Sequence, residues 1–218
     1  MNTTFAELKL KIIRCLSDEA ETVEYQPLGG ATYSADLLKD SVHAALDAIC
    51  SRLWKSETFE VDPEVDTWPL PDDLLDIESV YEKGLGLFIP RISMRVGSSL
   101  SSSIGNGWLM YPHGVITFVN DVSSSGCTVH YSARWAKPEE DGDALDPPAS
   151  TLTCLILFAA SYCLLTDATS SASIDRFKTK VDSGQPTDNP AKEMSNFMLH
   201  RFEVEMQRLP MMEKGRVQ

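Results

Sequence analysis

Hydrophobic residues recur at helical intervals near the start of the chain. Over residues 4–17 the apolar positions fall on one face and predict an amphipathic helix: Phe5, Leu8, Ile12, Cys15 and Leu16. Thr4 and Glu7 have capping-box spacing, in which a hydroxyl and a carboxylate bind free amides of the first turn. A second helix is predicted over about residues 34–55, with Ser34 as its N-cap.

Between the helical segments the pattern alternates with a period of two. Such alternation, bounded by turn residues, predicts strands near 58–61, 75–81, 85–92, 107–119 and 126–135. Pro69 and Pro71 exclude a helix and enforce an extended path. The serine-rich segment 97–105 has little apolar surface to bury, and we expect it to be mobile in an isolated subunit.

Helical periodicity returns after a polar, proline-containing loop at 137–148. Residues 152–165 are almost continuously apolar and predict a helix that is buried on nearly every side. This stretch is shorter than the roughly 20 apolar residues of a membrane span, so we expect none. Small residues at 167–173 predict a link to a short helix near 174–181.

A final helix is predicted from Asn189-Pro190, with asparagine as the cap and proline at the first helical position. Its apolar positions are Met194, Phe197, Met198, Phe202, Met206 and Leu209. The order of helices, sheet and helices predicts an α+β fold, in which the terminal helices form one bundle and an antiparallel β-sheet is inserted. The predicted divisions are 1–57, 58–146 and 147–218.

Charge and cysteine content restrict the classes of protein that fit. The net charge of −13 argues against a DNA-binding surface, because phosphate recognition needs a basic face. Acids concentrate at 61–80, whereas the segment 201–218 carries four bases and three acids. The five scattered cysteines predict buried thiols in a reducing compartment rather than a disulfide framework.

The sequence contains no convincing reactive site. The four histidines are far apart, and the chain lacks the spaced cysteines or His-Glu-x-x-His motif of a metal site. His43 beside an apolar stripe is more often structural, and the acids Asp72, Asp73 and Asp76 read as a solvated run rather than a cation site. We therefore expect neither a cofactor nor catalysis.

The sequence supports binding to other proteins better than it supports catalysis. Five of the eight methionines follow residue 193, and methionine suits both cores and adaptable docking faces. The segment Leu209-Pro-Met-Met212 follows the last helix and is expected not to fold back into the bundle. Exposed apolar residues at a terminus indicate either a partner groove or disorder.

Several elements together resemble the head-to-tail connector (adaptor, neck) proteins of tailed bacteriophages. They are Trp68-Pro-Leu-Pro71, the strands 76–80, 114–118 and 126–133, and the acidic loop before the long apolar helix. The resemblance implies a helical bundle with a β-rich insertion. It also implies a ring of subunits, commonly twelvefold, that lies beneath the portal protein, extends the DNA channel and binds another neck or tail protein.

Carried onto this sequence, the resemblance implies two groups of contact residues. The portal side would use Arg208, Leu209, Met211 and Met212, and the tail side would use the loop 97–106 through Ser99, Leu100, Ser101 and Ile104. DNA would pass through without sequence-specific binding. The expected location is the virion neck, reached from the host cytoplasm during assembly, with no membrane contact.

Two other interpretations remain open on sequence grounds. A tail-completion or terminator protein would contact the tail tube instead of the portal. A small hydrolase or ligand-binding protein would require a dispersed site, for example one that gathers Asp121, His130 and Arg134.

Overall fold

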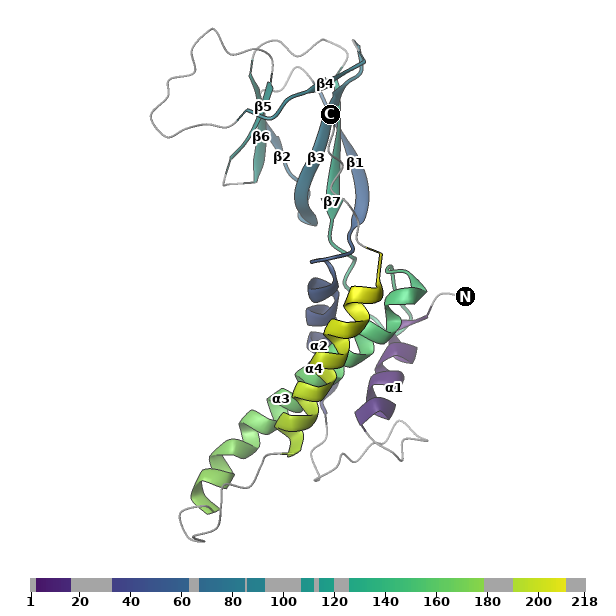
Figure 1. Ribbon diagram of the computed structural model, residues 1–218. Helices are drawn as coiled ribbons and strands as arrows, with labels where there is room; N and C mark the ends of the chain where they lie inside the picture. The colour runs from purple at the N-terminus through teal and green to yellow at the C-terminus, as the bar shows by residue number, and fades with distance from the viewer. Residues whose placement is uncertain are drawn as a thin grey trace. The chain divides into compact units, whose positions relative to one another are not determined.

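The chain builds helices at both ends and strands between them. The computed structural model describes residues 3–16, 33–62, 67–84, 86–92, 107–111, 114–119, 126–178 and 190–210. Within these residues, α1 (Phe5–Leu16) and α2 (Ala35–Ile49) precede the strands, and α3 (Leu152–Lys178) and α4 (Pro190–Arg208) follow them (Figure 1). The predicted α+β class, with terminal helices that pack together and inserted antiparallel sheets, is confirmed.

The structure divides into two compact units. The helical unit comprises described residues within Met1–Leu53 and Trp135–Met212, and the sandwich unit runs from Trp54 to Arg134. The predicted insertion, 58–146, starts and ends later than the sandwich unit. The loop 137–146 belongs to the helical unit because both early helices hold it: the Phe5 amide donates to the Asp143 carbonyl at 2.9 Å, and His43 Nε2 donates to the Pro138 carbonyl at 2.9 Å.

The starts of the early helices follow the caps in the sequence. The Thr4 amide donates to Glu7 Oε2 at 3.2 Å, and the Glu7 amide donates to Thr4 Oγ1 at 3.3 Å, which is the predicted capping box. Ser34 caps α2 by accepting a bond from the Leu37 amide at 3.1 Å. The end of α2 differs from the prediction: the helix stops at Ile49, and the chain turns before entering a strand at Lys55.

Helix α3 is the central element of the helical unit, since α1, α2 and α4 all pack against it. It is one continuous helix, so the predicted break at 167–173 is wrong. Those residues are alanine, threonine, serine and aspartate, and none of them breaks a helix as glycine or proline does. Helix α3 is also less enclosed than predicted: Leu157 and Phe158 are only partly buried, and Tyr162 and Leu165 are exposed.

Helix α4 begins at Pro190, as the sequence predicts. Its inner face packs on α3 through Met198, Phe202 and Met206. The Phe202 ring meets the Phe158 ring edge to face with centroids 5.0 Å apart, and the buried Ser195 hydroxyl donates to a carbonyl of α3 at 2.8 Å.

The sandwich unit contains two antiparallel sheets that share one core. The first has the order β1-β7-β3-β4, and the second has the order β2-β6-β5. The strands are β1 (Lys55–Val61), β2 (Thr67–Pro69), β3 (Leu74–Glu82), β4 (Leu87–Ile89), β5 (Gly107–Tyr111), β6 (Val115–Val119) and β7 (Cys127–Ala133). Val80 and Val129 of the first sheet are buried in one cluster with Trp108 and Ile116 of the second.

Strand β3 pairs with β7 through an irregular register that skips Leu75 and Glu78. Glu78 has no paired residue on β7, and its carboxylate accepts hydrogen bonds from two neighbouring side chains. Its Oε1 accepts a bond from Trp54 Nε1 at 3.1 Å and another from the Ser132 hydroxyl at 2.7 Å. Bulges of this kind bend a strand and redirect its side chains.

The chain leaves the helical unit and returns to it at a single point. Leu53 and Trp135 are both buried, and the Trp135 indole N–H donates to the Leu53 carbonyl at 3.0 Å. Beyond this point β1 and β7 pair along their whole length, from Lys55 with Ala133 to Val61 with Cys127.

Replacing Trp135 by phenylalanine tests this point. Trp135→Phe keeps a ring but leaves the buried Leu53 carbonyl without its donor, and should lower the free energy of unfolding by about 1–3 kcal/mol. Trp68→Phe is the matched control, because Trp68 donates to the Asp62 carbonyl at an exposed site. Denaturant unfolding measures both. Equal, small losses in the two variants would show that the Trp135 bond is not a structural requirement.

Candidate interaction surfaces

The C-terminal end of α4 carries the described part of the predicted portal contact. Arg208 is exposed and pairs with Glu205 at 2.6 Å. Leu209, expected to project beyond the bundle, is instead only 6% exposed and lies in the core of the helical unit. The Leu209 amide donates a hydrogen bond to the Met206 carbonyl at 3.2 Å. This turn places the Leu209 side chain on the inner face of α4.

Arg52 holds this end of α4 in place. Its Nε donates to the Leu209 carbonyl at 3.0 Å, and a terminal guanidinium nitrogen donates to the Gln207 carbonyl at 3.0 Å. The last carbonyls of a helix have no partner within the helix, and a cation there also suits the negative end of the helix dipole. Arg52 therefore fixes where the chain leaves the bundle. Nothing in the sequence pattern marks this role, because the two groups are far apart in the chain.

The remaining predicted contact residues lie outside the described residues. They are Met211 and Met212 on the portal side, and Ser99, Leu100, Ser101 and Ile104 on the tail side. Asp121, one member of the dispersed hydrolase site, lies outside them too. Their partner contacts stay predictions.

The described residues on either side of segment 93–106 are joined to each other. The Ile92 amide donates to the Trp108 carbonyl at 2.8 Å, and the Trp108 amide donates to the Pro90 carbonyl at 3.1 Å. The Trp108 ring is buried, its Nε1 donates to the Ile89 carbonyl at 3.1 Å, and the Arg91 guanidinium lies 5.3 Å from the ring centroid. Segment 93–106 thus begins and ends at one well-packed point.

Gly107 makes this close approach feasible. A Cβ on Gly107 would lie 2.3 Å from side-chain atoms of Ile92, closer than any real contact. A side chain at this position would require the Ile92 side chain to move.

Helices α3 and α4 leave apolar side chains on the surface of the helical unit. The exposed ones are Tyr162, Leu165, Met194, Phe197 and Leu199. The stretch Ala149–Thr166 has a mean hydropathy of 1.8 and is long and apolar enough, by length and composition alone, to cross a membrane. In this structure 39% of it is buried. Its packing against three other helices is that of a central core helix.

An acidic face covers α2 and the loop 137–146. Its exposed acids are Asp36, Asp40, Asp47, Glu139, Glu140 and Asp141. Three lysines bridge it: Lys137 pairs with Asp47 at 2.7 Å, Lys39 with Glu139, and Lys9 with Asp141. Backbone amides of Glu140 and Glu139 donate to Asp143 at 2.9 and 2.8 Å, and these bonds hold the pKa of Asp143 below its usual value.

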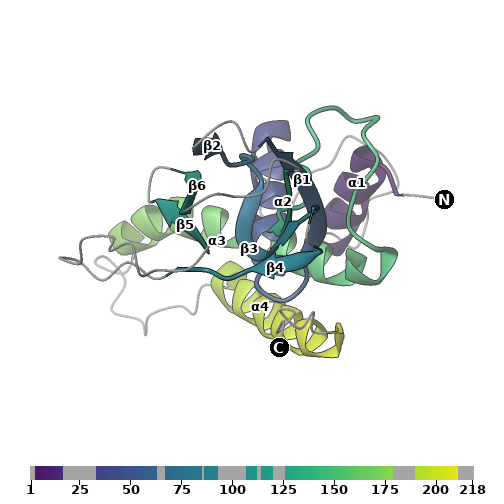
Figure 2. The same ribbon diagram turned by 90° about the horizontal axis from the view of Figure 1, so that it is seen from above.

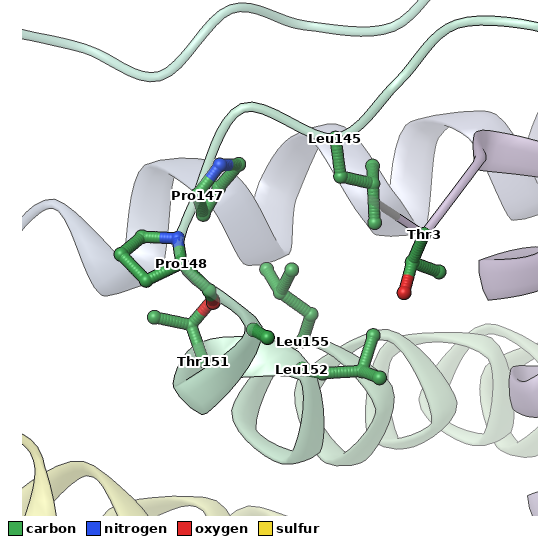
Figure 3. Close-up of a pocket in the computed structure, with 8 residues that line it drawn as sticks. Thr3, Leu145, Pro147, Pro148, Thr151, Leu152 and Leu155 are labelled. Carbon is green, nitrogen blue, oxygen red and sulfur yellow. The ribbon is translucent and has the colours of Figure 1, made fainter. Parts of the chain in front are cut away.

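A small pocket lies where the N-terminal residues meet the start of α3 (Figure 3). Its volume is about 40 Å³, and its lining consists of Thr3, Leu145, Pro147, Pro148, Ala149, Thr151, Leu152 and Leu155. None of these side chains is ionisable. The polar side-chain groups of the pocket are the hydroxyls of Thr3 and Thr151, and its lining contains no carboxylate, imidazole or thiol.

Reactive chemistry has little support among the described side chains. No group of three or more His, Cys, Asp or Glu residues within the described ranges is arranged to hold a metal ion. Burial raises the pKa of the Cys127 thiol to about 11, with a further contribution from Glu82, and burial alone raises that of Cys163 to about 11. Thiols with such pKa values are protonated at neutral pH and are poor nucleophiles.

Comparison of the chain with models of known protein families finds no match, and comparison with curated proteins finds none either. A role for the chain therefore has to be inferred from the geometry above and from the pattern of its sequence.

Removing the Arg52 guanidinium should loosen the end of α4. Arg52→Gln loses two charge-assisted hydrogen bonds, which should lower the free energy of unfolding by about 1–3 kcal/mol, and Arg52→Lys should lose less. Arg14→Gln, at an exposed site in α1, is the matched control. Chemical denaturation gives the energies, and hydrogen exchange at residues 205–209 locates the effect. Unchanged exchange at these residues in Arg52→Gln would contradict the role of Arg52 in holding the end of α4.

A methyl group at Gly107 should disturb the base of segment 93–106. Gly107→Ala is expected to cost about 1–3 kcal/mol because the new carbon overlaps Ile92. Trimming the neighbour in Ile92→Ala/Gly107→Ala should recover part of that loss. Gly142→Ala is the control, since its added carbon meets nothing within 4 Å. Thermal unfolding of the four proteins measures the effect, and a harmless Gly107→Ala would refute the proposed overlap.

Proposed function

We propose that this chain is a structural subunit of the head-to-tail connector of a tailed bacteriophage. Its copies form a ring, twelvefold by resemblance to the family, that joins the portal protein to the next neck or tail protein and extends the DNA channel. The ring has no catalytic role and needs no cofactor. Subunits assemble in the host cytoplasm and remain in the virion neck, without a membrane anchor.

The observation that carries this proposal is the order of elements along the chain. The two ends of the chain build one helical bundle, and an antiparallel sandwich is inserted between Leu53 and Trp135. This is the architecture that the sequence resemblance implies. The exposed apolar side chains of α3 and α4 are a further support, because a subunit that closes into a ring buries such surface on its neighbours.

The described geometry supports a distinct role for the end of α4. A segment that binds another protein loses less entropy when its starting point is already fixed. Arg52 fixes that point by binding the carbonyls of Gln207 and Leu209. In this proposal Arg208 and residues 211–212 contact the portal, while Leu209 anchors the segment within the bundle. Segment 97–106 contacts the tail-side protein from its joined base at Ile92 and Trp108.

The net charge of −13 also suits a DNA channel. A duplex that moves through the channel must not adhere to the wall, and an excess of carboxylates repels the phosphate backbone. The same charge weighs against any role that depends on holding DNA.

Two measurements test the proposal. Electron microscopy of the purified chain should show closed rings, and mass spectrometry of purified virions should find the chain in stoichiometric amounts. A photo-reactive residue at position 208 should cross-link to the portal protein. Absence of the chain from virions would overturn the proposal, and a cross-link to the tail tube protein instead would assign the chain to tail completion.

A further inference from the structure

We draw no further inference here: the strongest candidate, the apolar surface patch on α3 and α4 (Figure 2) where Tyr162, Leu165, Met194 and Phe197 are exposed, carries nothing because nothing in the structure shows what covers it.

Discussion

The structure depends on how an insertion leaves and re-enters a helical bundle. With an inserted domain the chain must leave the bundle once and re-enter it once. At each of these two places, backbone N–H and C=O groups need hydrogen-bond partners. Here one buried bond, from the Trp135 indole to the Leu53 carbonyl, joins the two places. Pairing of β1 with β7 then begins at Lys55 and Ala133. Because exit and return are tied together, the helices from both ends of the chain can pack as one unit.

A second constraint follows from the central position of α3. A helix that packs against three others has apolar residues around most of its circumference, whereas each surrounding helix needs only one apolar face. Helix α4 nevertheless exposes Met194 and Phe197 outside its inner face, and α3 retains exposed Tyr162 and Leu165. In the proposed ring, neighbouring subunits would cover this apolar surface.

Local signals predicted much of the fold. The capping box at Thr4 and Glu7, the Ser34 cap and Pro190 placed three helix starts, because each acts through neighbouring backbone groups. Features set by distant contacts were missed. Helical periodicity could not separate the inner face of α4 from exposed Met194 and Phe197, since the buried and exposed apolar residues recur at the same spacing. Burial of Leu209 and the bonds of Arg52 depend on the turn after α2 meeting the end of α4.

The two hydrogen bonds from Arg52 to the end of α4 also affect how the chain carries an applied force. Tension applied to the chain beyond Pro210 enters the helical unit along the backbone at Leu209, and the bonds from Arg52 to the carbonyls of Gln207 and Leu209 give part of it a second path. From there the load passes through Arg52 to the turn after α2, and through the Phe202–Phe158 contact to α3. Tension is thus shared between two helices from opposite ends of the sequence. The last turn of α4 therefore does not bear the whole load.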